Sequence, residues 1–233
     1  MSNILLEDLE YIYKNNNANN FFQDKTVLIT GAAGFLGSYM SNYLLYKFKD
    51  LKLKNIYLSD INISSIKKNI IFNKANNKCK ILKSDVTDKD SSIFDIKKVD
   101  IIIHAATIAS PTFYRKHPLK TAEANVDGLK NLLNFSLKKQ INRILFFSSS
   151  EIYGDPDRKN IPTKETYNGN VSCMGPRACY DESKRFGETL CYIYNQTYNL
   201  PIRIVRPFNN YGPFLSTRDK RLPSDLLKKV MNN

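Results

Sequence analysis

The sequence predicts an α/β fold in which helices cover both faces of a doubly wound parallel sheet. Short β-branched apolar runs alternate with longer stretches of helical periodicity, an order typical of parallel strands joined by helical crossovers. A glycine-rich turn also links the first apolar run to the first long periodic stretch. With 233 residues and 42% apolar content, the chain can bury a full core. Its length favours one large domain plus a small partial one.

The pattern places six strands and the helices between them. A short amphipathic helix at 3–14 and an Asn-rich connector at 15–20 precede the first strand. The expected strands cover 25–30, 55–60, 79–84, 99–104, 143–148 and 202–207. The expected later helices cover 35–44, 88–94, 120–138, 176–198 and 224–231.

Three glycines follow the first strand. Gly31 allows a tight turn, Gly34 lets the backbone approach a pyrophosphate, and Gly37 lets the next helix pack closely on the sheet. The N-terminus of that helix would face the anion. The second strand ends in Asp60, 23 positions after Gly37, about where a carboxylate hydrogen-bonds an adenosine ribose. Together these features predict a Rossmann-like dinucleotide site.

The acid at the end of the second strand also discriminates between cofactors. Asp60 would repel a 2′-phosphate, and no arginine follows it before Lys67 to compensate, so NAD is favoured over NADP. Asp85 follows the third strand, where its side chain would face the adenine edge or would cap a local turn. Both interpretations of Asp85 stay open.

A tyrosine and a lysine share one face of the helix expected at 176–198. Tyr180 and Lys184 are four residues apart, and such pairs also occur by chance on helix surfaces. Bringing the pKa of a phenol to neutrality requires roughly 4 kcal/mol of phenolate stabilisation. A fixed ammonium and a cationic cofactor ring could supply it jointly. With the glycine turn upstream, the pair predicts a catalytic base.

Hydroxyl groups and a carboxylate follow the fifth strand in the order Ser148-Ser149-Ser150-Glu151. Chemistry in a parallel sheet gathers at the carboxyl ends of the strands. A serine there can hydrogen-bond a substrate hydroxyl, and Glu151 could act as acid, base or electrostatic partner. The alternative is a Ser-rich turn in which Glu151 caps the next segment. His104 ends the fourth strand, and we expect it to be a hydrogen-bonded structural residue.

Composition argues against several other classes of function. The net charge of +13 (35 basic minus 22 acidic) comes mainly from scattered lysines, without an Arg-rich cluster with interleaved aromatics, so no nucleic-acid partner is expected. No apolar run approaches the ~20 residues that span a bilayer, so no membrane partner is expected. The N-terminus lacks signal-peptide organisation, and the four cysteines show no C-x-x-C pairing. We expect a cytoplasmic protein without a metal site.

Taken together, these motifs resemble the extended short-chain dehydrogenase/reductases, the NAD-dependent epimerase/dehydratase family, which act on nucleotide sugars. The resemblance covers nearly all of the chain after Phe21. The segments that carry it, in the family's order, are Gly31-x-x-Gly34-x-x-Gly37, Asp60, Asp85-Val86, His104-Ala105-Ala106, Ser148-Ser149-Ser150-Glu151-x-Tyr153-Gly154, Tyr180-x-x-x-Lys184 and Arg206-Pro207-Phe208-Asn209-Asn210-Tyr211-Gly212-Pro213.

Within the family, the chain looks most like the UDP-glucuronate decarboxylase (UDP-xylose synthase) group. The segments behind this closer resemblance are Ala109-Ser110-Pro111, Gly154-Asp155-Pro156, Gly169-Asn170-Val171, Gly175-Pro176-Arg177-Ala178-Cys179-Tyr180-Asp181-Glu182 and Glu188-Thr189-Leu190-Cys191-Tyr192.

The resemblance implies a set of site residues. The implied catalytic residues are Tyr180, Lys184, Ser149, Ser150 and Glu151. The implied NAD contacts are Gly31, Gly34, Phe35, Leu36, Gly37, Asp60, Asn62, Asp85, Val86, Ala105, Ala106, Thr107, Asn125, Ser148, Tyr180, Lys184 and Pro207. The implied contacts to a UDP-sugar substrate are Ser110, Pro111, Tyr114, Arg177, Asn209 and Arg221, of which Arg221 matches the family's downstream arginine only loosely.

The resemblance also implies a reaction. Tyr180 would take the proton of the sugar 4-hydroxyl while hydride passes to NAD, and the resulting β-keto acid would lose CO₂ before the hydride returns. A 4,6-dehydratase typically has an Asp-Glu pair where this chain has Ser150-Glu151, so one carboxylate is missing for that elimination. A 4-epimerase stays open as well, because it needs only the tyrosine, lysine and serine with a loose pocket.

Family members continue through a C-terminal lobe that closes over the sugar nucleotide. The chain therefore divides into a helix and connector at 1–20, an NAD-binding domain at 21–208 and, at 209–233, the start of an incomplete C-terminal substrate lobe. A catalytically incomplete NAD-binding fragment, or half of a split enzyme with a separate C-terminal polypeptide, is a further alternative. The two long helices have apolar faces that could pair in a homodimer, although burial against the sheet explains them too.

Overall fold

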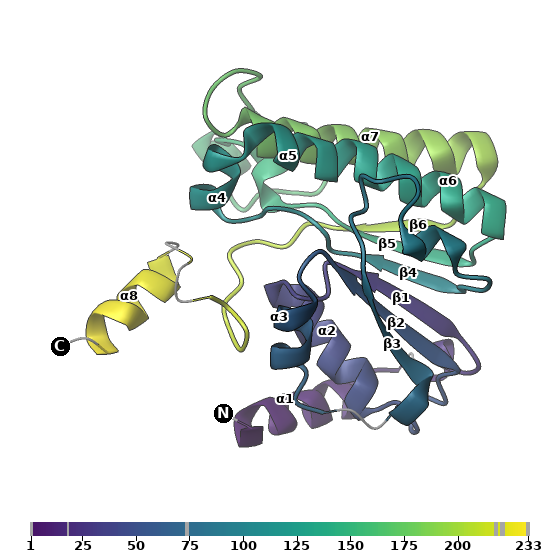
Figure 1. The fold of residues 1–233 in the computed structure, drawn as a ribbon. Coiled ribbons are helices and arrows are strands. Elements are labelled where there is room, and N and C mark those ends of the chain that lie inside the picture. Colours follow the sequence, from purple (N-terminus) through teal and green to yellow (C-terminus); the bar gives the residue numbers. More distant parts are fainter. Residues whose placement is uncertain (1, 18, 73–74, 217–218, 220–221, 232–233) are drawn as a thin grey trace.

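The computed structural model describes residues 2–17, 19–72, 75–216, 219 and 222–231. Within these residues, six strands form one parallel sheet in the order β3-β2-β1-β4-β5-β6 (Figure 1). The strands are β1 (Thr26–Thr30), β2 (Asn55–Asp60), β3 (Cys79–Lys83), β4 (Ile101–His104), β5 (Arg143–Phe147) and β6 (Ile202–Val205). The order reverses between β1 and β4, which opens a crevice at the carboxyl ends of these strands. The predicted doubly wound, Rossmann-like fold is confirmed.

Helices cover both faces of the sheet, with α1 to α3 on one side and α4 to α7 on the other (Figure 1). The α-helices are α1 (Ser2–Lys14), α2 (Phe35–Tyr46), α3 (Ile63–Asn69), α4 (Pro111–Lys116), α5 (Pro118–Glu123), α6 (Leu129–Lys139), α7 (Ala178–Tyr198) and α8 (Leu222–Met231). Short 3₁₀ helices are η1 (Asn19–Phe22), η2 (Asn76–Lys78), η3 (Ser92–Asp95), η5 (Ser150–Tyr153) and η6 (Arg158–Asn160), and η4 (Ala124–Gly128) is a π-helical turn.

The core consists of two apolar layers, one on each face of the sheet. Every residue of β1 is buried, and its side chains alternate between the layers. Val27 and Ile29 belong to the layer that includes Leu44 of α2, whereas Leu28 belongs to the layer that includes Leu133 of α6. This double burial explains why β1 reads as a continuous apolar run.

The N-terminal helix α1 is part of the first layer. Leu5 and Leu9 are fully buried, and the Glu10 carboxylate accepts hydrogen bonds of 2.6 Å from both Tyr46 and Lys47 of the α2 region. At the other end of the chain, α8 projects from the body (Figure 1), and its apolar side chains are exposed. The most exposed of these are Leu222, Leu227, Val230 and Met231.

Two predicted helices were wrong in detail. The helix expected at 88–94 is a turn followed by η3, because the side chains of Asp85 and Asp88 accept backbone N–H groups two residues on and stabilise turns instead. The helix expected at 120–138 is interrupted by η4, whose wider turn separates α5 from α6. The other expected elements lie within a few residues of their predicted bounds.

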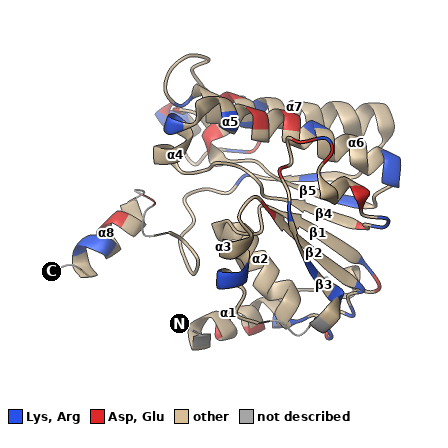
Figure 2. Cartoon of the chain, in the orientation of Figure 1, with Lys and Arg blue, Asp and Glu red and all other residues tan. Residues whose placement is uncertain are grey.

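Basic residues occur in both helical layers and in the sheet, in keeping with the scattered lysines of the sequence (Figure 2). Among the helices that the structure describes, none has both the length and the apolar character needed to cross a membrane. All four cysteines are free thiols. The described residues form no cluster of His, Cys, Asp and Glu side chains suited to a metal ion.

Candidate functional site

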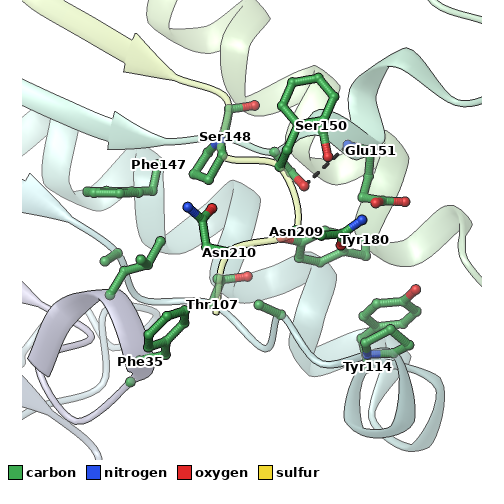
Figure 3. A pocket seen from close by; sticks show the side chains of 18 of the residues that line it. Phe35, Thr107, Tyr114, Phe147, Ser148, Ser150, Glu151, Tyr180, Asn209 and Asn210 are labelled. Carbon is green, nitrogen blue, oxygen red and sulfur yellow. Dashed lines mark hydrogen bonds between the residues drawn. The ribbon is translucent and has the colours of Figure 1, made fainter. Parts of the chain in front are cut away.

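A cavity of about 350 Å³ lies at the carboxyl ends of the strands. The glycine turn, the segment after β4, the serines after β5, Tyr180 and the segment after β6 all contribute to its wall. In Figure 3, Phe35 and Phe147 lie toward one end of this cavity, and Glu151, Tyr180 and Tyr114 lie toward the other. The topology of the sheet thus brings together residues from 34 to 210.

Most of the predicted site residues line this cavity. From the NAD set, these are Gly34, Phe35, Leu36, Gly37, Ala105, Thr107, Ser148, Tyr180 and Pro207. From the catalytic and substrate sets, they are Ser149, Ser150, Glu151, Pro111, Tyr114, Arg177 and Asn209. The residues that lie outside its wall are Gly31, Asp60, Asn62, Asp85, Val86, Ala106, Ser110, Asn125 and Lys184. Arg221 lies outside the described residues.

The glycine turn has the close contacts that a dinucleotide cradle requires. Gly31 has a φ of +75°, and a Cβ there would lie 2.5 Å from the backbone carbon of Ala105. A Cβ on Gly37 would lie 2.0 Å from the Gly31 carbonyl oxygen, so α2 could not pack as it does. Gly34 caps α2 without a side chain and faces the cavity, which leaves the helix N-terminus accessible to an anion. These residues fit a bound pyrophosphate.

Asp60 ties the end of β2 to the glycine turn. Its Oδ2 accepts the Ala33 N–H and its Oδ1 accepts the Asn62 N–H, each at 3.0 Å. Burial raises the pKa of this carboxyl, and the backbone hydrogen bonds oppose the rise. Each carboxylate oxygen has a second lone pair, so the ionised group can still accept ribose hydroxyls. The backbone of the glycine turn therefore helps to hold the carboxylate at the place where it would contact the ribose.

Two other predicted NAD contacts have local partners. The Asn62 side chain caps α3 by accepting the Ser65 N–H at 3.0 Å. The Asp85 carboxylate accepts both the N–H and the hydroxyl of Thr87. For Asp85 the structure thus shows the turn cap, one of the two interpretations that the sequence left open.

Tyr180 and Lys184 lie on the buried face of α7. The ring of Tyr180 stacks on that of Tyr114, with centroids 5.1 Å apart and planes 10° from parallel. The Lys184 Nζ donates a hydrogen bond of 2.7 Å to the Phe147 carbonyl and lies 5.9 Å from the centroid of the Tyr180 ring. Burial lowers the pKa of Lys184 to about 7, because the ammonium loses its hydration.

His104 lies behind this pair in the sheet. Its Nδ1 is 2.8 Å from the Thr30 hydroxyl oxygen, which confirms the prediction of a hydrogen-bonded structural histidine. Burial, with a smaller effect from the nearby Lys184 charge, lowers the pKa of His104 to about 3. The ring is therefore neutral near pH 7, and it adds no positive charge beside Lys184.

The serines after β5 have different surroundings. Ser149 caps η5, and its hydroxyl oxygen accepts the Glu151 N–H at 3.3 Å. The Ser148 Oγ is buried at the cavity wall without a hydrogen-bond partner among the described residues. A buried hydroxyl without a partner is costly, so this group is a candidate for contact with a ligand.

Glu151 does more than cap a turn. It lies within η5 and pairs with the Arg177 guanidinium at the cavity wall. The Arg177 Nε also contacts the Asp181 carboxylate at 3.2 Å. Asp181 was not predicted as a site residue, although its position four residues after Arg177 on a helix was a usable signal.

A buried amide links the cavity to α7. Asn125, in the π-helical turn η4, is fully buried. Its Oδ1 accepts the Thr107 hydroxyl at 2.6 Å, and its Nδ2 donates to the Ser183 Oγ at 2.8 Å. Asn125 therefore supports the cofactor side of the site through Thr107. Ser183 was not predicted from the sequence.

The arrangement has a defined chemical capacity. A buried phenol with a lysine behind it, three serine hydroxyls and a carboxylate paired with a guanidinium surround one cavity. The glycine turn at the same cavity has the geometry that a pyrophosphate would need. Such a site can remove a proton from a substrate alcohol beside a nicotinamide, which is the chemistry of a dehydrogenase-type enzyme.

Comparison with known proteins gives the family. Residues 27–233 match the sequence model of the NAD dependent epimerase/dehydratase family. The chain therefore belongs to this family, and both the predicted resemblance and NAD as the cofactor are confirmed.

Three relatives illustrate the match. UDP-glucuronic acid decarboxylase 6 from Arabidopsis thaliana is 37% identical over 212 residues, which are 91% of this chain and 58% of the relative. A UDP-N-acetylglucosamine 4-epimerase from Methanobrevibacter ruminantium, in complex with UDP-N-acetylmuramic acid, has a TM-score of 0.76 at 26% identity and covers 90% of this chain and 64% of its own. A UDP-glucose 4-epimerase from Thermus thermophilus, in complex with NAD, has a TM-score of 0.69 at 25% identity, covering 84% and 58%. The chain thus spans less than two thirds of each relative.

Proposed function

We propose that this chain provides the NAD-binding and catalytic part of a UDP-glucuronate decarboxylase, which forms UDP-xylose through a 4-keto intermediate. The observation that carries the proposal is the convergence of Tyr180, Glu151 and Arg177 on one cavity beside the glycine turn. An acidic sugar needs a cation for its carboxylate as well as a base for its hydroxyl. The decarboxylase relatives at 37% identity support this choice.

The first step is proton removal at C4 of the sugar. Tyr180, as phenolate, takes the proton of the 4-hydroxyl, and Ser149 hydrogen-bonds the same oxygen. Lys184 lies behind the Tyr180 ring, where its ammonium stabilises the phenolate. Bound NAD would supply the acceptor and reversible store for the C4 hydride.

The second step breaks the C5–C6 bond of the β-keto acid. The carboxylate leaves as CO₂, and its bonding electrons move to C5 and the C4 oxygen. A proton then adds at C5, and we assign its delivery or relay to Glu151 and Ser150, which both line the cavity. Arg177 holds the carboxylate before cleavage by a charge-assisted contact, and Asn209 holds the diphosphate.

A 4-epimerase is the second candidate, favoured by the fold neighbour with a TM-score of 0.76. It would use Tyr180, Lys184 and Ser149 alone. A 4,6-dehydratase fits less well, because Ser150 stands where an acidic partner of Glu151 is needed. If the chain binds NAD but turns over no sugar, the better account is a catalytically incomplete NAD-binding fragment, or half of a split enzyme that acts with a separate C-terminal polypeptide.

Further parts of the proposal concern organisation. We assign 1–20 to an N-terminal helix and connector, 21–208 to the NAD-binding domain and 209–233 to the start of a substrate lobe. The exposed apolar residues Phe186 and Ile193 of α7 support a homodimer through the two long helices. We place the protein in the cytoplasm, where UDP-sugars are its substrates.

The test is incubation of the 233-residue chain with NAD and UDP-glucuronate while CO₂ release is measured. We expect release by the wild type, loss by at least about a hundredfold in Tyr180→Phe, and little change in the exposed control Tyr192→Phe. A 4-keto-6-deoxy sugar from UDP-glucose or dTDP-glucose would support the dehydratase instead. Interconversion of C4 epimers without CO₂ would support the epimerase.

A further inference from the structure

Arg177 stands between two carboxylates with different surroundings. It is the N-cap residue of α7, and Asp181 lies in the first turn of the same helix. The Arg177 Nε contacts the Asp181 Oδ2 at 3.2 Å, while its Nη2 contacts the Glu151 Oε2 across the cavity wall. The guanidinium therefore contacts a carboxylate of its own helix through Nε and a carboxylate at the cavity wall through Nη2.

The Asp181 side chain is buried, whereas that of Arg177 is half-exposed. Burial raises the pKa of the Asp181 carboxyl, and the pair with Arg177 opposes the rise. Its Oδ1 has no hydrogen-bond partner among the described residues. A buried carboxylate with one unpaired oxygen depends strongly on its remaining ion pair. Asp181 therefore differs from a surface carboxylate that pairs with an arginine, because the surrounding residues hold its buried side chain in place.

Other charged and titratable groups near this pair come from neighbouring elements. The phenol of Tyr114, on α4, is fully buried and interacts electrostatically with both Arg177 and Asp181. Glu182, next along α7, adds a weaker repulsion on Asp181 and pairs with Arg185 at 3.7 Å. Since Glu182 pairs with Arg185, Arg177 is the cation that pairs with Asp181 at the cavity.

We propose that Asp181 is a positioning residue that keeps the Arg177 guanidinium at the cavity when this guanidinium exchanges Glu151 for the carboxylate of an acidic sugar. This inference rests on the proposed function. Arginine suits the role, because its planar fork has donors on two edges and can hold one carboxylate while it takes another. Asp181 would thus determine the preference for an acidic over a neutral nucleotide sugar without touching the sugar.

The test is calorimetric binding of UDP-glucuronate and UDP-glucose to the 233-residue chain loaded with NADH, which cannot accept a hydride, so neither sugar is turned over. UDP-glucuronate carries a carboxylate at C6, where UDP-glucose carries a hydroxymethyl group. The ratio of the two Kd values therefore measures the preference for the acidic sugar. We expect Asp181→Asn to reduce the preference for UDP-glucuronate at least about tenfold, with less than about a twofold effect on UDP-glucose. Glu182→Gln is the matched control, because it removes the same charge one residue away, and it should keep the preference.

The outcomes separate the two proposals. A wild type that prefers UDP-glucuronate while Asp181→Asn keeps the full preference overturns the role of Asp181 and leaves the proposed function standing. A wild type without any preference contradicts the proposed function, and the inference falls with it. Equal loss in Glu182→Gln also overturns the inference, because it would mean that net charge alone is responsible.

A second variant covers the case in which Asp181→Asn does not fold. Arg177→Lys keeps the positive charge, but a single ammonium lacks the two-edged fork. We expect Arg177→Lys to lose the preference as well. Where Asp181→Asn does fold, it should add no further loss in the Arg177→Lys background. Retention of the preference in Arg177→Lys would contradict the inference.

Discussion

The Nζ atom of Lys184 lies 2.7 Å from the carbonyl oxygen of Phe147, which ties the middle of α7 to the last residue of β5. Ser148, Ser149 and Ser150 follow Phe147 directly, and Tyr180 lies one helical turn before Lys184. One buried hydrogen bond therefore holds the proposed base close to the hydroxyls that share its substrate. The ammonium is almost fully buried, and its pKa is lowered to about 7.

This buried ammonium makes stability depend on pH. Lys184 has a pKa of about 7 in the folded protein and an ordinary value of 10.5. Between these values the unfolded chain binds more protons at this amine than the folded protein does. The free energy of unfolding therefore rises by about 1.4 kcal/mol per pH unit, and this stability is lost again as the pH falls toward 7. We expect Lys184→Met to remove this slope, as measured by urea unfolding from pH 7 to pH 10. The same slope in both proteins would contradict the lowered pKa.

The glycine turn provides a matched pair of substitutions. A Cβ on Gly37 would lie 2.0 Å from the Gly31 carbonyl oxygen, whereas a Cβ on Gly34 would meet only that oxygen, at 3.3 Å. Gly37→Ala should therefore lower stability by about 2 kcal/mol or more. Gly34→Ala should keep most of the stability and weaken NAD binding at least about tenfold, because the methyl group occupies the space of the pyrophosphate. Thermal unfolding and calorimetry with NAD measure the two effects, and normal NAD affinity in Gly34→Ala would exclude this placement.

Ser148 should matter for a ligand more than for folding. Its buried hydroxyl has no partner among the described residues, so Ser148→Ala removes an unsatisfied group and should change the free energy of unfolding by less than about 1 kcal/mol. If NAD or the sugar supplies the missing partner, affinity falls about threefold to tenfold in the same variant. A substantial loss of stability with unchanged affinity for both ligands would show that the hydroxyl is structural.

Arg206 anchors the segment that leads from β6 into the site. It forms two hydrogen bonds with Glu188 of α7, at 2.9 and 2.6 Å, and another with the Tyr153 hydroxyl at 2.9 Å. Glu188→Gln should lower the free energy of unfolding by about 2 kcal/mol, because the pair is mostly buried. Glu182→Gln, in a more exposed pair, should cost less than about 0.5 kcal/mol. Equal costs in denaturant titration would contradict the role given to Arg206.

The sequence was informative where a function depends on local spacing. The glycine turn needs only residues 31 to 37, and the Tyr180 and Lys184 pair needs only one helical turn. The expected strand–turn–helix and the shared helix are both found in the structure, and the roles of these residues stay predictions. The helix at 88–94 was wrong because Asp85 and Asp88 form side-chain turns that compete with helical hydrogen bonds. Apolar periodicity does not reveal that competition.

Long-range contacts were beyond sequence reasoning. The pairing of Glu151 with Arg177 joins η5 to the start of α7, and the link from Thr107 through Asn125 to Ser183 joins three segments. The spacing of these residues along the sequence does not predict such contacts, because they depend on tertiary packing. The π-helical turn around Asn125 was not predicted either.

The most direct measurement of the central claim is the absorbance of reduced nicotinamide after rapid mixing of the NAD-loaded chain with UDP-glucuronate. We predict a transient rise in the wild type, as C4 is oxidised, and no rise in Tyr180→Phe at unchanged NAD affinity. A rise of equal size and rate in Tyr180→Phe would contradict the assignment of Tyr180 as the base.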